Sequence, residues 1–158
     1  WFKGRIYEEK CDLSPDGKLF VYFVHQGSRA GTDFTDSWLA VSRPPWLHAL
    51  VVWPSGTTYG VGARFTGPRE LWGISAEGTH PDHPLHGLKV AKRRPEPRPP
   101  IDIVPEADWS GHDHAGHVIY SKGDLLFRRE KNADAVIADF SDLTPDPRPA
   151  PEWATRRL

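Results

Sequence analysis

The sequence predicts an all-β protein of blade-like antiparallel hairpins, and three observations support this prediction. Strand-like runs rich in β-branched and aromatic residues are short and are separated by turn residues. No segment of useful length has the periodicity of an amphipathic helix. The 14 glycines and 16 prolines supply many turns but stay below the level typical of disordered chains. We expect open twisted sheets, as in a sandwich, or a small incomplete propeller.

The first strand is expected at residues 4–7 and the strongest one at residues 18–25. Apolar residues occupy both faces of the second run, with Leu19, Val21 and Phe23 on one face and Phe20, Tyr22 and Val24 on the other. Because burial on both sides is what favours such a pattern, we expect an internal strand. Further strands are expected at residues 37–42, 48–53, 59–65, 70–75 and 88–90.

A proline-rich stretch separates these runs from the last strands. Residues 93–105 contain five prolines, which lack the backbone donor that a strand ladder needs, so most of this stretch is expected to be linker or loop. Residues 117–121 and 124–129 form a predicted hairpin whose turn contains Gly123. The last strand is expected at residues 135–140.

The chain ends in a second proline-rich segment. Residues 144–158 contain four prolines, which favour an extended tail that runs over the surface, with Trp153 buried as its anchor. The sequence therefore predicts a single β domain over residues 1–143, with a linker or loop near residues 93–105, followed by an extended tail over residues 144–158.

The charge, hydropathy and cysteine content exclude several classes of partner. A formal net charge of −1 gives no general attraction to nucleic acid or to an anionic membrane. No apolar run approaches the length of a membrane span, which takes about 20 residues. Cys11 is the only cysteine, so an intrachain disulfide is impossible. One cysteine and no recognisable leader favour a cytoplasmic location, although the chain starts at Trp1 and a leader could have been removed.

A repeated polar turn gives the chain a family resemblance. Two phrases share a polar turn and a glycine ahead of an apolar run, namely Leu13-Ser14-Pro15-Asp16-Gly17 and Asp108-Trp109-Ser110 followed by Gly116. They resemble the blade motif of PD40-type, TolB-like β-propeller repeats. The resemblance implies blade-like hairpins and assigns no catalytic residue. Because a blade takes roughly 40 residues, the chain holds about four at most. The tail around Trp153 also resembles that of a bacterial protein family, without implying an activity.

Six of the eight histidines fall in two clusters. They are His80, His83 and His86 in the first cluster and His112, His114 and His117 in the second. Neutral imidazoles with nearby carboxylates, here Asp82 and Asp113, are the usual ligands of zinc and other divalent transition metals, so one interpretation is a metal site shared between two loops. The other is a pair of solvated turns shaped by proline, histidine and aspartate. The sequence favours this second interpretation, in which the histidines shape turns and the protein has no cofactor.

The middle third of the chain concentrates tryptophan. A stacking surface for a sugar or a nucleotide could be formed by Arg43, Trp46, Trp53, Arg64 and Trp72. The same tryptophans would also suit an aromatic core, which the sequence favours over a binding surface.

The sequence thus favours a non-enzymatic protein-interaction or structural module. Its partner is expected to be a protein, with self-association as a further expectation, and its affinity would come from exposed aromatic residues and the proline-rich segments. Two alternatives stay open: a metal-binding protein or metal-dependent enzyme that uses the histidine loops, and a carbohydrate- or nucleotide-binding domain. No catalytic residue is assigned, because lone cysteines such as Cys11 are usually buried apolar groups and no serine lies in a nucleophile-elbow motif.

Overall fold

The computed structural model describes residues 2–60, 62–96, 104–113, 115–131, 133–144 and 146–158. Within these residues the regular structure is nearly all β, in three open sheets, which confirms the predicted fold class. The chain divides into two compact units, residues 1–95 with 147–158 and residues 96–146. The boundary between residues 95 and 96 falls within the proline-rich stretch that the sequence predicts as linker. Residues 97–103 of that stretch lie outside the described residues.

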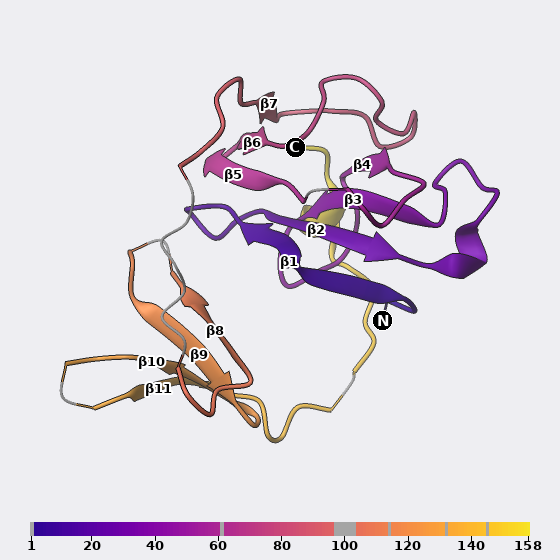
Figure 1. Cartoon of the computed structure of the whole chain (residues 1–158). Helices are drawn as coiled ribbons and strands as arrows, with labels where there is room; N and C mark the ends of the chain where they lie inside the picture. The colour runs from indigo at the N-terminus through magenta and orange to yellow at the C-terminus, as the bar shows by residue number, and fades with distance from the viewer. Residues whose placement is uncertain (1, 61, 97–103, 114, 132, 145) are drawn as a thin grey trace. The chain divides into compact units, whose positions relative to one another are not determined.

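The larger sheet of the first unit is an antiparallel meander in the order β1-β2-β3-β4 (Figure 1). Its strands are β1 (Arg5–Leu13), β2 (Phe20–His25), β3 (Ser37–Ser42) and β4 (Val51–Pro54). The internal position of β2 confirms the prediction from its two-faced apolar pattern. The bounds of β3 match the predicted run, whereas β1 extends well beyond residues 4–7 and β4 starts later than residue 48.

Both faces of β2 are buried, each in its own apolar cluster. Val21 and Phe23 belong to the cluster on one face, and Tyr22 and Val24 belong to the cluster on the other, together with Trp38. Val21 and Val24 have no exposed surface (0%). The strand therefore holds the first unit together from the inside, because apolar area is removed from water on both of its sides.

A second, smaller sheet covers part of the first of these clusters. Its strands are β5 (Arg64–Gly67), β6 (Glu70–Trp72) and β7 (Lys89–Val90), of which β6 and β7 are parallel. Phe65 and Leu71 pack into the same cluster as Val21. The strands β5 and β6 are shorter than the predicted runs at residues 59–65 and 70–75. At Gly62, an added Cβ atom would lie 2.6 Å from the backbone of Lys10, so this glycine allows the loop before β5 to pass directly over β1.

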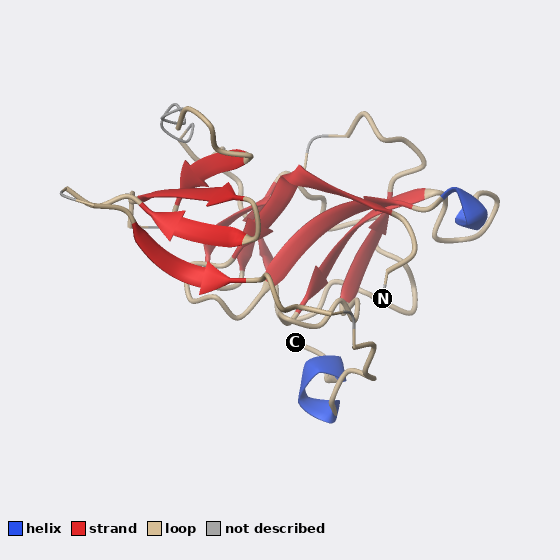
Figure 2. Ribbon diagram, turned by 90° about the horizontal axis from the view of Figure 1, so that it is seen from below, coloured by secondary structure: helices blue, strands red, loops and turns tan. Residues whose placement is uncertain are grey.

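The second unit contains one antiparallel sheet in the order β11-β10-β9-β8. Its strands are β8 (Trp109–His112), β9 (Val118–Lys122), β10 (Leu125–Arg128) and β11 (Ala135–Asp139) (Figure 1). Figure 2 shows in red that strands make up most of the regular structure. The predicted hairpin around Gly123 is confirmed by the pairing of β9 with β10. The interpretation of Asp108-Trp109-Ser110 as a turn is wrong, because Trp109 and Ser110 pair with β9 as the start of β8.

The true turn of this unit's first hairpin lies between Asp113 and His117. Asp113 N–H donates to His117 O at 3.0 Å, and Gly116 N–H donates to Asp113 O at 3.1 Å. The turn between β1 and β2 has the same kind of closure, since Gly17 N–H donates to Ser14 O at 2.8 Å. Both glycines have a positive φ, 69° for Gly17 and 85° for Gly116, which a residue with a side chain adopts at a cost.

The tail from residue 147 onward belongs to the first unit. From residue 147 the tail is extended up to Pro151 and then forms the single turn α1 (Glu152–Thr155). Pro145, in the predicted tail, lies outside the described residues. The predicted anchor is wrong, because Trp153 is 50% exposed while Ala154 is fully buried. The small methyl side chain is buried, and the indole ring stays at the surface. A second short helical turn, η1 (Gly27–Arg29), follows β2. In the described parts of the chain, helices are too short and too polar to cross a bilayer.

Candidate functional site

A hollow of the first unit, which we call the basic pocket, has a volume of about 400 Å³. Its charged and aromatic lining consists of Asp16, Lys18, Arg43, Arg69 and Trp153. These residues come from the β1–β2 turn, the end of β3, the β5–β6 turn and α1. The pocket therefore depends on the fold of the whole unit, and no local sequence pattern contains it.

The β1–β2 turn holds the acidic and one basic residue of the pocket in place. The buried hydroxyl of Ser14 donates to Asp16 Oδ1 at 2.7 Å and accepts the Leu19 N–H at 2.9 Å. This hydroxyl bond is the main reason why the pKa of Asp16 lies below its usual value, with the Lys18 N–H and ammonium as further causes. Lys18 Nζ lies 3.5 Å from Asp16 Oδ2, and its side chain is 80% exposed. The turn thus places the ionised carboxylate of Asp16 beside the exposed ammonium of Lys18.

Arg43 fastens the tail to the sheet. Its Nη1 donates to Arg156 O, and its Nη2 donates to Arg157 O at 3.3 Å. A guanidinium at the end of a helical turn satisfies carbonyls that have no partner within the helix. Desolvation lowers the pKa of Arg43, and the positive charge of Arg69 lowers it further. Neither guanidinium makes an ion pair with a carboxylate of the described residues.

The first histidine cluster is mainly structural. His80 N–H donates to Val52 O at 2.9 Å, and Val52 N–H donates to His83 O at 3.2 Å, so this loop covers the outer edge of β4. The His80 ring is buried, stacks on Phe34 with 4.0 Å between ring centroids, and its Nδ1 accepts the Asp82 N–H at 3.2 Å. Those contacts occupy one face of the ring and one of its nitrogens, as expected of a residue that shapes a turn.

Beside this loop lies a smaller hollow of about 130 Å³, which brings His48 together with Asp82, His83 and His86. His48 was not among the residues that the sequence singled out. Desolvation lowers the pKa of His83, and the neighbouring His80 lowers it further, so the ring is neutral near pH 7. In the described part of the chain, no three or more His, Cys, Asp or Glu side chains are grouped as metal ligands.

The second histidine cluster belongs to the other unit and supports the β8–β9 turn. Asp113 Oδ1 accepts the N–H groups of Ala115 and His117 at 2.9 and 2.8 Å, and Asp113 Oδ2 lies 3.0 Å from His117 Nδ1. These backbone and imidazole bonds lower the pKa of Asp113 against an opposing effect of desolvation. His112 lies in β8, and His114 is outside the described residues. Asp113 and His117 therefore satisfy each other within a single turn.

The aromatic and arginine residues proposed as a stacking surface lie in different surroundings. Trp53 is a core residue, 8% exposed, and its Nε1 donates to Ser75 O at 3.0 Å. Arg64 and Trp72 are directly opposite each other on β5 and β6, and Trp46 lies in the loop after Arg43. Of the five residues, Arg43 lines the basic pocket. Lys18, Arg69 and Trp153, which the sequence reasoning missed as binding residues, lie with it.

Cys11 is unsuited to nucleophilic chemistry. Its thiol donates to Tyr7 O at 3.1 Å within β1, and burial is the largest of the causes that raise its pKa. A reactive cysteine needs the opposite shift, because the thiolate is the nucleophile.

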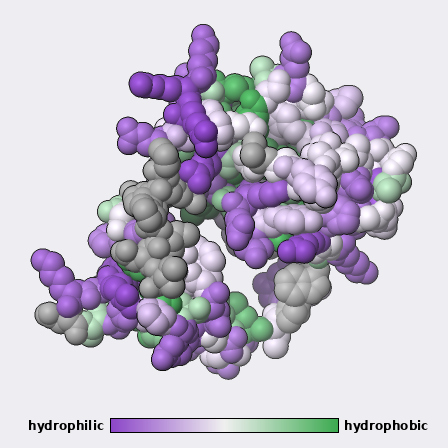
Figure 3. All heavy atoms as spheres, viewed as in Figure 1, coloured by the Kyte–Doolittle hydropathy of each residue, from purple (hydrophilic) through white to green (hydrophobic). Residues whose placement is uncertain are grey.

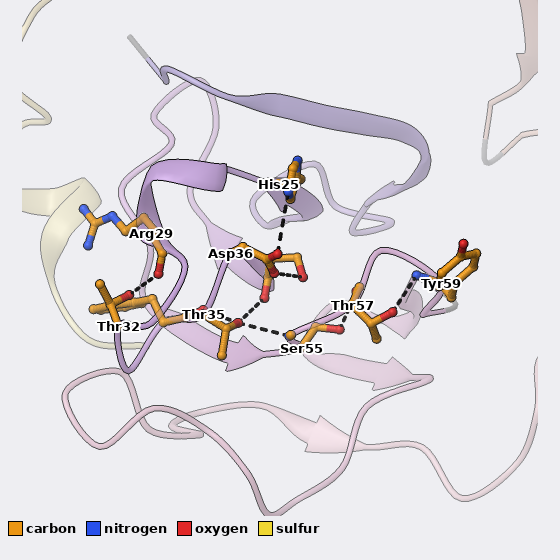
Figure 4. A network of polar contacts seen from close by, with 11 residues as sticks. His25, Arg29, Thr32, Thr35, Asp36, Ser55, Thr57 and Tyr59 are labelled. Carbon is orange, nitrogen blue, oxygen red and sulfur yellow. Dashed lines mark hydrogen bonds and ion pairs between the residues drawn. The ribbon is translucent and has the colours of Figure 1, made fainter.

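Polar side chains also tie together the loops at the far end of the larger sheet (Figure 4). Thr35 Oγ1 donates to Ser37 O at 2.7 Å and accepts the Gly56 N–H at 3.0 Å. His25 Nε2 lies 3.8 Å from Asp36 Oδ2. These bonds join the β2–β3 loop to the loop after β4 and satisfy backbone groups that the sheet leaves open, so the network stabilises the loops.

The outer strand of the second unit presents an apolar edge. In the sheet of the described residues β11 pairs with β10 on one side and has no strand on the other. Val136 and Ile137 are adjacent in β11, at the point where its register against β10 shifts, and they are 54% and 45% exposed. Phe140 and Leu143, which follow the strand, are also exposed. Apolar atoms reach the surface among hydrophilic ones in this part of the chain (Figure 3).

Comparison with protein-family models, with curated proteins and with solved structures finds no match to this chain.

Proposed function

We propose that the protein is a non-enzymatic interaction module that binds an extended segment of a partner protein along β11. The observation that carries the proposal is the exposed apolar edge formed by Val136 and Ile137. An edge strand offers a row of backbone donors and acceptors to another chain, and natural proteins usually protect such an edge with lysine, proline, a β-bulge or a covering loop. The run from Ala135 to Ala138 contains neither lysine nor proline, and the register shift of β11 is in its pairing with β10.

Addition of a strand to a sheet edge is a recurring mode of peptide recognition. The backbone hydrogen bonds of the added strand provide affinity, and alternate side chains provide specificity. Because Val136 and Ile137 are both exposed, a partner segment with apolar residues would bury part of both side chains. Such a segment needs no catalytic group in this protein.

Charge favours a different protein over a second copy as the occupant of this edge. In an antiparallel pair of two β11 strands centred on Ile137, Asp139 of each copy would face the neighbourhood of Asp134 in the other. Like charges across a strand pair are destabilising. A partner strand with basic residues at its ends would instead complement both carboxylates.

The test is selection of peptides from a random display library against the full-length protein, followed by affinity measurement with purified peptides. We expect enriched peptides with β-branched and aromatic residues, which protect β11 amides from hydrogen exchange. Ile137→Lys should weaken their binding about tenfold or more, equivalent to about 1.4 kcal/mol or more. Leu143→Lys is the matched control, because it places the same charge at an exposed apolar residue of the same unit beyond β11.

Two results would contradict the proposal. One is peptide binding that Ile137→Lys and Leu143→Lys weaken equally, or that leaves β11 amides unprotected. The other is a concentration-dependent dimer in analytical ultracentrifugation that Ile137→Lys dissociates, in a protein that selects no peptide. The dimer would identify a second copy as the occupant.

A further inference from the structure

We propose that the basic pocket of the first unit binds a small molecule that joins a phosphate monoester to a flat ring, of which a nucleoside monophosphate is the simplest form. This site is independent of the β11 edge, because all of its lining residues belong to the first unit.

The charge of the pocket favours an anion. Among the side chains of its lining, Lys18, Arg43 and Arg69 contribute three positive charges, and Asp16 contributes one negative charge. Asp16 already accepts the Ser14 hydroxyl and the Lys18 N–H, so its carboxylate is occupied on the side of the turn. The remaining excess of two positive charges matches a phosphate monoester, which carries about −1.5 to −2 near pH 7.

The two guanidinium groups are suited to hold such a phosphate. Arg43 is fixed in place by its bonds to the carbonyls of Arg156 and Arg157, and a guanidinium carries five N–H donors, so donors remain after these two bonds. Arg69, from the opposite turn, is close enough to lower the pKa of Arg43. A dianion between them would remove this like-charge repulsion and accept bidentate hydrogen bonds, which arginine makes with phosphate.

Trp153 is the reason why we expect the ligand to contain a flat ring. Its side chain lines the pocket and is half exposed, while the adjacent Ala154 takes the buried position on α1. An indole left at the wall of a cationic pocket can stack on a planar group while the phosphate reaches the arginines. The volume of about 400 Å³ lies in the range of natural small-molecule sites, about 300–1,000 Å³. This is room for a ring and a sugar, and too little for a folded polymer.

The experiment is isothermal titration calorimetry of the full chain with four probes at one fixed salt concentration: AMP, adenosine, glucose 6-phosphate and inorganic phosphate. AMP should bind, and the three probes that lack either the phosphate or the flat ring should each bind about tenfold more weakly or worse. The same titrations are repeated with Arg69→Gln, Lys18→Gln and Trp153→Ala, whose side chains are exposed. Arg43 is left intact because it also holds the tail.

Arg69→Gln should weaken AMP binding about tenfold. Lys18→Gln should weaken it less, because the Lys18 side chain is 80% exposed and its ammonium already lies near Asp16. Trp153→Ala should weaken AMP binding while leaving that of glucose 6-phosphate unchanged. Lys3→Gln is the control, since it removes one positive charge from an exposed residue of the same unit that does not line the pocket. Unchanged melting temperatures show that the variants remain folded.

Three outcomes would overturn the proposal. The first is no heat of binding with millimolar AMP. The second is equal affinity for AMP and glucose 6-phosphate, which would leave an anion site without ring recognition. The third is AMP binding that Arg69→Gln and Lys3→Gln weaken equally, which would reflect the general charge of the protein and not this pocket.

Discussion

Replacement of Val21 by alanine tests whether β2 is the strand on which the first unit depends. Val21 is fully buried in an internal strand and packs in the cluster that also contains Phe65 and Leu71. Loss of two buried carbon atoms costs about 0.8 kcal/mol each in transfer free energy, and the cavity left behind adds up to about 1 kcal/mol. We therefore expect the free energy of unfolding to fall by about 1.6–2.6 kcal/mol.

Differential scanning calorimetry measures this effect directly. For a unit of this size, a loss of 1 kcal/mol lowers the melting temperature by roughly 4–8 °C, so Val21→Ala should lower it by roughly 6–21 °C. Val136→Ala in β11 removes the same atoms from a side chain that is 54% exposed, and should change stability by less than about 0.5 kcal/mol. A decrease below about 3 °C for Val21→Ala, or equal effects of the two substitutions, would refute the two-sided burial of β2.

Two further predictions concern the turn and the tail of the first unit. Because the Ser14 hydroxyl is the main cause of the lowered pKa of Asp16, whose ordinary value is 3.8, the ionised carboxylate stabilises the fold above about pH 4, and this contribution is lost as the pH falls through the lower, folded-state pKa. Ser14→Ala should therefore flatten the acid part of the melting temperature against pH, and parallel curves for the two proteins would contradict it. In the tail, Ala154→Leu should cost about 1–3 kcal/mol by overpacking, while Trp153→Phe at the exposed neighbour should cost less than about 0.5 kcal/mol in thermal melts; equal costs would show that the ring also anchors the tail.

The strands could be predicted wherever the alternation of apolar residues is itself the cause of the structure. Phe20 to Val24 are apolar on both faces, and an internal strand is what buries both. The failure at β8 has the opposite cause. Trp109 to His112 includes a glycine and no β-branched residue, so its strand propensity is poor. The strand forms because it pairs with β9, the next strand along the chain, and the residues of β8 taken alone do not show this pairing.

The candidate sites were harder to predict because they consist of residues that are distant in the sequence. Lys18, Arg43, Arg69 and Trp153 lie in four segments that are far apart in the sequence, and each is an ordinary surface residue when taken alone. For the two histidine clusters the sequence favoured turns, and several of their contacts lie in or beside such turns. His80 stacks on Phe34, and His117 pairs with Asp113 inside its own turn.

The first hairpin of each unit has a turn with a similar pattern of hydrogen bonds, although the residue types differ. Ser14 and Asp113 occupy the same position, three residues before a glycine with positive φ. In each case the carbonyl accepts the glycine N–H, and a side-chain oxygen accepts the N–H of the residue that begins the next run, Leu19 in one unit and His117 in the other. A hydroxyl and a carboxylate can perform the same task because both place an acceptor near the backbone of the turn. The second turn therefore lies at Asp113 to His117, directly around Gly116, and not at Asp108-Trp109-Ser110.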